Sequence, residues 1–382
     1  MERRRSVLLL PGQGAQRERM AAGLYEAREE FTAPMDEFFG RLGTTGARLR
    51  SAWLRPAPNP ELDESAVAQP LLLAVGHALG RAVGAAAEPP ALLLGHSVGE
   101  LAAACLAGVF DPADIGALAA ARSRSLEGTG YGGMLAVAAS EGQLAEELGG
   151  FGGRPTVGAD GLAVGADGAA VAGVTAAGVA DARVAVGTAF AGVAVAALNG
   201  PRQTVLAGPR EALAAVEQHL RDRGFLVRAL RSGHAFHSPA MEGAALRFAE
   251  ALAAFGPRAP RAAAGTVVST RTGVAVTAEQ ARDPHFWGGQ LAAPVRYWPA
   301  LRELLDTLGR RPGLLLLDGS ADRSLSAPAR HHPAVRDGAS EVVPLLAVGR
   351  DAGGPADARV FAEALHRLGE QRDHTGDHTV VS

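Results

Sequence analysis

The chain has 382 residues, of which 47% are hydrophobic, and its formal net charge at pH 7 is −3. This length allows two or three domains with sizeable cores, and the charge gives no electrostatic reason to expect nucleic acid or an anionic membrane as a partner. The single cysteine excludes an internal disulfide. The apolar run at residues 7–10 is too short for a signal peptide, and the least polar stretch, residues 184–198, is shorter than a bilayer span, so we expect a cytoplasmic α/β protein.

The first predicted element in chain order is a strand at residues 7–10, which leads into the loop Pro11-Gly12-Gln13-Gly14-Ala15-Gln16. This loop lacks both the G-x-G-x-x-G spacing and the Lys-Ser/Thr pair of phosphate-binding loops, which argues against a nucleotide site. A glycine-rich loop of this kind can instead bring a backbone N–H group close to a reacting atom. Helical patterns follow at residues 20–39 and 71–83.

The strongest candidate for chemistry is the hexapeptide Gly95-His96-Ser97-Val98-Gly99-Glu100. A predicted strand at residues 91–94 precedes it, and a predicted helix at residues 101–109 follows it. Glycines on both sides of Ser97 permit a tight corner, and the first free N–H groups of the helix point at any negative charge that develops beside the serine. This setting favours a nucleophile over a structural turn. Cys105, two turns further on, is expected to be a buried core residue rather than a reactive thiol.

The next predicted helix spans residues 112–126 and carries Arg122. After it, the order and length of the predicted elements change. Residues 128–133 form a glycine-rich break, and beyond it the predicted order βαββαβ is that of a ferredoxin-like module. Its elements are residues 134–138, 141–148, 193–198, 204–207, 210–223 and 225–230. The stretch at residues 152–189 is almost wholly Gly, Ala and Val, so we expect an expanded loop with at most short strands.

The remainder of the chain returns to longer helices and apolar strands. The helices are predicted at residues 241–255, 294–305 and 356–368, and the strands at residues 265–269, 313–318 and 341–346. We therefore divide the chain into a large α/β catalytic part at residues 1–133 and 233–348, and a small module at residues 134–232 that contains the insertion at 152–189. Residues 349–382 form a C-terminal helix and a polar tail that we expect to be disordered.

His237 is the best-placed general base for Ser97 among the 11 histidines. It stands where the small module ends and the large part resumes, and sites are usually built in the crevices between modules. His96, although adjacent to Ser97, should point away from it at so sharp a corner. No Asp is obviously placed to complete a triad, so a Ser–His dyad steadied by a backbone carbonyl is the simpler interpretation.

Several motifs occur in one order along the chain: the loop at residues 11–16, the Ser97 hexapeptide, Arg122, Gly133-Met134-Leu135-Ala136-Val137, Asn199-Gly200-Pro201 and His234-Ala235-Phe236-His237-Ser238-Pro239. Together they resemble the malonyl-CoA:acyl-carrier-protein acyltransferases, most closely the acyltransferase domains of polyketide synthases. The resemblance implies an α/β fold, in which a hydrolase-like large subdomain with a parallel sheet is interrupted by a ferredoxin-like small subdomain. It also implies a ping-pong reaction that passes an acyl group from coenzyme A to the phosphopantetheine thiol of a carrier protein.

The resemblance further implies roles for single residues in the chemistry. Ser97 would be the nucleophile, and His237 the general base and then the general acid. The backbone N–H groups of Gln13 and Val98 would form the oxyanion hole, in keeping with the rule that the residue after an elbow nucleophile supplies one donor. The backbone carbonyl of Gln290 would hold the imidazole of His237.

Other matched residues would recognise the acyl group. Arg122 corresponds to the arginine that grips the free carboxylate of malonate, and its planar fork suits a bidentate pair. Arg124 lies about 200° further around the same predicted helix and should face elsewhere. His234 and Phe236 match the His-Ala-Phe-His pattern that accompanies malonyl rather than methylmalonyl selection, and a bulky Phe236 would leave little room for a branch.

The expected partners are malonyl-CoA and an acyl carrier protein of polyketide or fatty acid biosynthesis. No metal and no cofactor is expected beyond the coenzyme A thioester substrate, because no His/Cys/Asp cluster has ligand spacing. Two alternatives use the same Ser–His pair: a hydrolase that clears stalled acyl groups, which Arg122 argues against, and a transferase for a non-malonyl acyl group. A non-catalytic carrier-binding scaffold is a third.

Two features depart from the family pattern. The insertion at residues 152–189 is longer than expected in this family, which leaves the small module's contact with a carrier open. Met1 stands directly before the first predicted strand, so we expect a free-standing enzyme that serves separate carriers.

Overall fold

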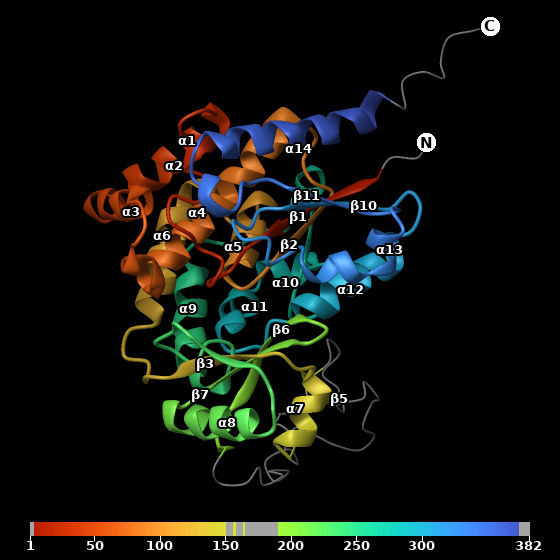
Figure 1. The fold of residues 1–382 in the computed structure, drawn as a ribbon. Helices are drawn as coiled ribbons and strands as arrows, with labels where there is room; N and C mark the ends of the chain where they lie inside the picture. Colours follow the sequence, from red (N-terminus) through yellow and green to blue (C-terminus); the bar gives the residue numbers. More distant parts are fainter. Residues whose placement is uncertain (1–3, 150–155, 158–162, 165–189, 374–382) are drawn as a thin grey trace, which may run out of the picture.

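The centre of the computed structural model, which describes residues 4–149, 156–157, 163–164 and 190–373, is a five-stranded parallel sheet. Its strands lie in the order β11-β10-β1-β2-β9 (Figure 1). They are β1 (Arg5–Leu10), β2 (Leu92–Gly95), β9 (Thr266–Val268), β10 (Leu314–Asp318) and β11 (Glu341–Pro344). All of β10 is buried, which accounts for its unbroken leucine run, because both faces of a parallel sheet are covered.

Helices cover both faces of this sheet (Figure 1). On one face, Leu8 and Leu10 of β1 share a core with residues of α2, α4, α5, α9 and α14. On the other face, Val7 and Leu9 pack with residues of α12. The helices outside the small module are α1 (Ala22–Tyr25), α2 (Glu29–Arg41), α3 (Thr44–Leu54), α4 (Ser65–Ala86), α5 (Val98–Leu106), α6 (Ile115–Ser125), α9 (Glu242–Ala253), α10 (Ala278–Arg282), α11 (Pro284–Gly288), α12 (Tyr297–Leu308), α13 (Pro333–Arg336) and α14 (Pro355–Asp373).

The helix α4 is long and apolar enough to cross a membrane, but 89% of its most apolar window is buried inside the fold, as in the core helix of a globular protein. It begins at Ser65, earlier than the predicted start at residue 71, and Pro70 lies inside it. A proline removes one helical hydrogen bond. The neighbouring Ala68 and Leu71 are fully buried, and this burial outweighs the local preference against a helix.

The single helix predicted at residues 20–39 is wrong, because the structure divides it into α1 and α2. Arg28 between them has extended backbone angles, with φ −137° and ψ 108°. Trp53 lies on α3, a helix that the sequence pattern did not predict, and its ring centroid lies 5.2 Å from that of Tyr25 in α1 and 5.8 Å from that of Phe39 in α2. The indole Nε1 of Trp53 donates to the carbonyl oxygen of Met20 at 2.8 Å.

The small module contains a four-stranded antiparallel sheet in the order β6-β7-β3-β8. Its elements are β3 (Gly133–Val137), α7 (Glu141–Glu147), β6 (Ala194–Gly200), β7 (Gln203–Gly208), α8 (Arg210–Asp222) and β8 (Val227–Leu230). This is the split βαβ topology of a ferredoxin-like unit. Leu144 of α7 and Val216 of α8 pack with the sheet in a core of its own. The predicted fold class is thereby confirmed.

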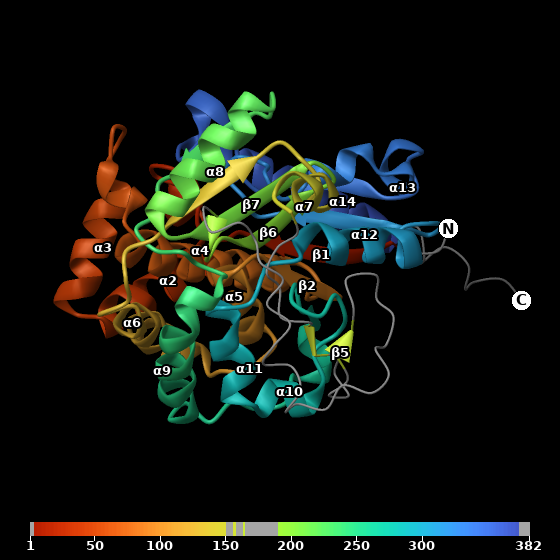
Figure 2. The ribbon, with the colours of Figure 1, turned by 90° about the horizontal axis from the view of Figure 1, so that it is seen from below.

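The small sheet lies against the large subdomain through β6. Figure 2 looks at the molecule from the side on which α8 and this sheet lie. Leu198 of β6 donates its N–H to the carbonyl of Val295 at 2.9 Å, and Val295 donates to Ala196 at the same distance. Within the insertion, Thr156–Val157 pairs with Ala163–Val164. The rest of the predicted loop and the predicted disordered tail lie outside the described residues.

Candidate active site

Ser97 lies at the corner between β2 and α5, as the sequence pattern predicts. Its backbone angles, φ 53° and ψ −121°, are rare for a residue with a side chain, and such strain concentrates at functional sites. The flanking glycines allow the turn. A Cβ atom at Gly95 would overlap the backbone of Gly99 and Glu100, and one at Gly99 would overlap the carbonyl of Leu10.

His237 lies directly beside the serine, with 2.8 Å between its Nε2 and the Oγ of Ser97. Its Nδ1 is 2.9 Å from the carbonyl oxygen of Gln290 and 3.1 Å from that of Ala293. A carbonyl only accepts, so Nδ1 carries the proton and Nε2 is left to accept from the serine hydroxyl. Among the residues that the structure describes, the pair is therefore oriented by backbone carbonyls, without an acidic third member.

The imidazole of His237 is held neutral by its surroundings. Burial lowers its pKa to about 3, and the positive charge of Arg122 acts in the same direction. A neutral imidazole can take up the serine proton, whereas an imidazolium cannot. The environment thus keeps His237 in the form that a general base requires.

Arg122, on the last turn of α6, is 1% exposed. Its Nε donates to the side-chain oxygen of Gln69 at 2.8 Å, and its Nη1 donates to the side-chain oxygen of Gln290 at 3.3 Å. Burial lowers its pKa to about 10, against the opposing attraction of Glu100, so the guanidinium stays charged at neutral pH. Within the part of the chain that the structure describes, its Nη2 has no hydrogen-bond partner. A buried, charged donor without an acceptor is suited to an anionic ligand.

The backbone N–H groups of Gln13 and Val98 are available beside the serine. Among the backbone hydrogen bonds of the described residues, neither group donates to a carbonyl. The loop that carries Gln13 approaches the corner closely, because a Cβ atom at Gly12 would lie 3.1 Å from that of Ser97. The side chain of Gln13 accepts a hydrogen bond from Gln69 at 2.9 Å, so the partner of Arg122 also fixes this loop.

Comparisons with known proteins establish the family of the chain. A sequence profile described as "Acyl transferase domain" matches residues 7–149 and 166–310, most of the chain. This chain belongs to the acyl transferase domain family. The family relationship makes it an acyltransferase.

Three proteins show how far this relationship extends. A phenolphthiocerol/phthiocerol polyketide synthase of Mycobacterium tuberculosis is 29% identical over 330 residues, which are 86% of this chain and 19% of that protein. The acyltransferase domain of SpnD, solved in complex with 2-(pent-4-yn-1-yl)malonyl, is 27% identical with a TM-score of 0.75 over 97% of this chain and 77% of that chain. A malonyl CoA-acyl carrier protein transacylase of Coxiella burnetii shares the fold, with a TM-score of 0.70 at 22% identity over 96% of this chain and 99% of that one.

A cleft of about 550 Å³ includes residues of the motif before His237 in its lining. Its lining residues are Gly233 and His234, together with Arg231, Asp63, Glu64, Ser65, Ala66, Ser123, Leu126 and Glu127. Phe236 lies deeper: it is 4% exposed, and its ring centroid is 6.4 Å from that of His237. The ring centroid of His234 lies 5.3 Å from that of Phe236, with the two rings tilted by 49°, so the two predicted recognition residues lie between the cleft and His237.

Other residues of the acyltransferase lie where the sequence predicts them. His96 points away from Ser97 and bonds through Nε2 to the side-chain oxygen of Asn199 at 2.8 Å. Cys105 is fully buried, and burial raises the pKa of its thiol well above the usual range. Arg124 is exposed on the opposite side of α6 from Arg122.

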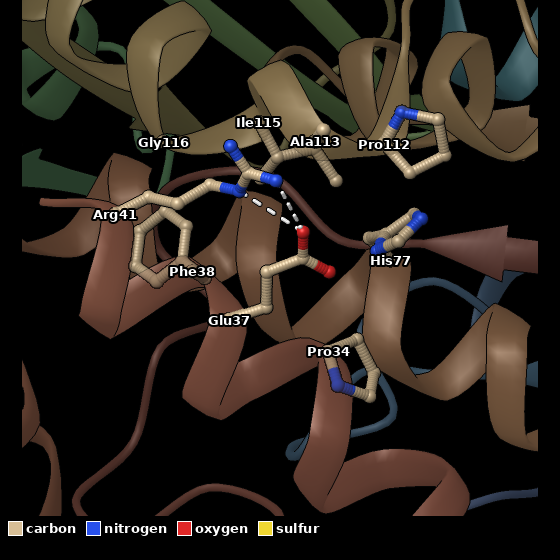
Figure 3. Close-up of a pocket in the computed structure, with 9 residues that line it drawn as sticks. All are labelled: Pro34, Glu37, Phe38, Arg41, His77, Pro112, Ala113, Ile115 and Gly116. Carbon is tan, nitrogen blue, oxygen red and sulfur yellow. Dashed lines mark hydrogen bonds and ion pairs between the residues drawn. The ribbon is translucent and has the colours of Figure 1, made fainter.

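A second, much smaller pocket of about 10 Å³ lies between α2, α4 and α6 (Figure 3). Figure 3 shows His77 at one end of it and the ion pair of Glu37 with Arg41 at the other, where Arg41 Nε and Glu37 Oε1 are 2.9 Å apart. Its volume matches that of one water molecule. Its lining contains none of the residues around Ser97, so it plays no part in the acyltransferase site.

Sequence reasoning missed three residues that hold the site together. Gln69 joins Arg122 to the loop of Gln13. Glu100 accepts a hydrogen bond from the side chain of Gln290, and Thr270 donates to Glu100 in turn. Glu100 belongs to the serine hexapeptide, which was the one available signal. The other two are common polar residues with no local pattern around them.

Proposed function

We propose that this acyltransferase moves a malonyl unit from coenzyme A to the phosphopantetheine thiol of an acyl carrier protein, in polyketide or fatty acid biosynthesis in the cytoplasm. The observation that supports malonyl most directly is the guanidinium of Arg122. It is buried and charged, it has an unpaired Nη2 within the described structure, and its field lowers the pKa of His237. An acyl group on Ser97 whose free end is a carboxylate would pair with it.

In the first half of the reaction, Ser97 Oγ attacks the thioester carbonyl while its proton passes to Nε2 of His237. The carbonyl oxygen becomes an oxyanion that accepts from the N–H groups of Gln13 and Val98. When the tetrahedral intermediate collapses, the C–S bond breaks and the proton on His237 passes to the sulfur of coenzyme A. The product of this half-reaction is malonyl-Ser97.

In the second half, the carrier's thiol gives its proton to the neutral His237 and its sulfur attacks the ester carbonyl of malonyl-Ser97. The same two N–H groups hold the oxyanion, and collapse breaks the bond to Ser97 Oγ. His237 returns the proton to that oxygen. Both halves use one base, because its orientation by the carbonyls of Gln290 and Ala293 is the same in each.

Arg122 contributes through geometry as well as charge. Its Nε and Nη1 are already fixed by two glutamine side chains, Gln69 and Gln290, so little side-chain entropy remains to be lost when a carboxylate binds. This preorganisation favours a malonyl ester over an acetyl ester. It also argues against a general hydrolase, which would need no fixed cation at this position.

The cleft beside His234 has the size for the pantetheine arm that coenzyme A and carrier proteins share. Its volume is about 550 Å³, within the range typical of small-molecule sites. Because the arm is common to both substrates, one cleft would serve both halves of the reaction.

Phe236 supports a preference for malonyl over methylmalonyl. Its ring is buried beside His237, where it would crowd a branch on the acyl α-carbon. One methyl group in an apolar pocket changes a rate by about 10- to 200-fold at most. When malonyl-CoA and methylmalonyl-CoA compete at equal concentrations, malonyl should be transferred faster by a factor within that range. The double variant His234→Tyr, Phe236→Ser should reduce this factor.

The transfer is tested by incubating the protein with malonyl-CoA and a phosphopantetheinylated carrier protein, then weighing the intact carrier. We expect the carrier to gain one malonyl group faster with the protein than without it. If free malonate accumulates while the carrier stays unloaded, the hydrolase alternative is correct. Repeating the incubation with acetyl- and methylmalonyl-CoA tests the acyl group separately from the transfer.

A further inference from the structure

Glu100, the last residue of the serine hexapeptide, is a buried carboxylate that the proposed reaction does not use. It is 1% exposed. One carboxylate oxygen accepts from the backbone N–H of Thr270 at 2.5 Å and from its hydroxyl at 3.1 Å. The other oxygen accepts from the side-chain Nε2 of Gln290 at 2.6 Å. Keeping a carboxylate buried is costly unless such partners compensate its charge.

This contact decides which way the amide of Gln290 faces. A carboxylate only accepts hydrogen bonds, so the NH2 group of Gln290 must face Glu100. The same NH2 group donates to the backbone carbonyl of Ser97 at 2.8 Å. The amide oxygen is consequently left to face Arg122, whose Nη1 lies 3.3 Å away.

Gln290 therefore connects the three parts of the site. Its side chain contacts the serine corner and Arg122, and its backbone carbonyl holds Nδ1 of His237 at 2.9 Å. In a polar network of this kind each donor must face an acceptor, so the orientation of one group fixes the orientation of the next. Here Glu100, which can only accept, fixes the orientation of the Gln290 amide.

We infer that Glu100 is a positioning residue, which orients the side-chain amide of Gln290 and through it the guanidinium of Arg122. The inference rests on the proposed malonyl transfer. It adds that the negative charge at Glu100 gives the carboxylate-binding guanidinium its fixed direction. Thr270 supports this role by anchoring the oxygen of Glu100 that does not face Gln290.

The substitution Glu100→Gln tests this directly, because it keeps the size of the side chain and removes its charge. The N–H of Thr270 still needs an acceptor, so the oxygen of the introduced amide stays there and its NH2 group turns toward Gln290. Two NH2 groups cannot face each other, so the amide of Gln290 flips. Its own NH2 group then opposes Nη1 of Arg122, and the carbonyl of Ser97 loses its donor.

The measurement is the rate at which malonyl-CoA and, separately, acetyl-CoA acylate the folded variant, followed by intact-protein mass. Malonyl acylation should fall about 10- to 100-fold, the range for losing a hydrogen bond to a charged group. Acetyl acylation should fall less, because an acetyl ester does not use Arg122. A purely structural role would lower both rates equally or leave both unchanged in the folded fraction.

A double-mutant cycle with Gln290→Ala shows whether Glu100 acts through Gln290. Gln290→Ala removes the amide and keeps the backbone carbonyl that holds His237. In that background, Glu100→Gln should cost less than about twofold further in malonyl acylation, because no amide remains to flip. Independent, multiplying losses would overturn the inference.

Asp357→Asn is the matched control. Asp357 is also 1% exposed, and its carboxylate accepts only backbone N–H groups among the described residues, those of Gly23, Ala347 and Gly353. It should lower the melting temperature without changing the ratio of malonyl to acetyl acylation. If it shifts this ratio as Glu100→Gln does, the effect is one of stability and the inference is wrong.

Thr270→Val keeps the inference testable if Glu100→Gln does not fold. It removes one of the two donors on the anchored oxygen, so it should lower the malonyl-to-acetyl ratio in the same direction and less. An unchanged ratio would contradict the inference. A wild-type protein that forms no malonyl adduct at all would instead contradict the proposed function on which it rests.

Discussion

At the scale of single residues, the protonation state of His237 follows from its burial. Burial and the nearby guanidinium lower its pKa to about 3, against an ordinary value of 6.5. The base is active when neutral, so its activity is present above the folded-state pKa and lost only as the pH falls through that value. His237 differs in this respect from an exposed histidine, which titrates near neutrality.

Acylation of Ser97 by malonyl-CoA should therefore be independent of pH between about 8 and 5. The check is a set of single-turnover rates, measured by intact-protein mass within the pH range in which the protein stays folded by circular dichroism. A rate that falls with a midpoint near the ordinary histidine pKa would mean that His237 titrates freely. The account of the buried base would then be wrong.

Arg122 and Arg124 offer a matched pair on one turn of α6. Arg122→Ala should reduce malonyl acylation by about 2–5 kcal/mol of activation free energy, the cost of stranding a buried ionic partner. Acetyl acylation should suffer far less. Arg124→Ala, at an exposed position two residues away, should leave both rates unchanged. Equal losses for malonyl and acetyl in Arg122→Ala would show that the arginine supports the fold and does not bind the carboxylate.

Much of the site could be predicted residue by residue, because the motifs are local. Ser97 needs glycines beside it in the chain, and His237 stands in a recognisable run before Ser238 and Pro239. Gln69 and Thr270 could not be found in this way. They bind residues far away in the sequence through single polar contacts, and such contacts leave no periodic pattern.

At the scale of elements, the strand–corner–helix unit depends on close backbone approach. A methyl group at Gly99 would overlap the carbonyl of Leu10 at the end of β1, which lies beside β2. Gly99→Ala should destabilise the protein by about 1–3 kcal/mol and slow acylation of Ser97, because the corner must shift. The measurements are urea unfolding and the malonyl acylation rate of the folded fraction.

Gly142→Ala in α7 is the control for this prediction. Nothing lies within 4 Å of the position of its added Cβ. It should be neutral or stabilise the protein by up to about 1 kcal/mol through the unfolded chain. If the two substitutions have the same effect on stability and rate, the tight packing at the corner has no special importance.

Elements with a continuous apolar pattern were predicted well, and those decided by distant packing were not. The strand over β1 and the helix over α8 needed only local periodicity. Beside the break between α1 and α2, Trp53 of the later helix α3 contacts Tyr25 and Phe39, and such distant contacts leave no local pattern. The start of α4 before Pro70 likewise depends on burial that the local sequence does not reveal.

At the scale of the whole molecule, two sheets of different topology meet around one site. The order of the parallel sheet places β1 beside β10, with Val7 opposite Leu316. No local pattern predicts a pairing across so much sequence. The ferredoxin-like module could be predicted from the sequence because its six elements follow one another in a known order.

The insertion at residues 152–189 contributes none of the described residues around Ser97, and the described core residues of the small module lie outside it. Replacing it with a short linker should therefore preserve acylation by malonyl-CoA. The check is intact-protein mass after incubation, with circular dichroism to establish that the deletion variant is folded. A folded variant that no longer acylates would show that the insertion belongs to the catalytic structure.

The most direct test of the central claim is the mass of the intact protein after brief incubation with malonyl-CoA. We predict the addition of one malonyl group to the wild-type chain and none to Ser97→Ala. Ser326→Ala, at another buried serine, should keep the adduct. An adduct that persists on Ser97→Ala, or a wild-type protein that never acquires one, would contradict a reaction through malonyl-Ser97.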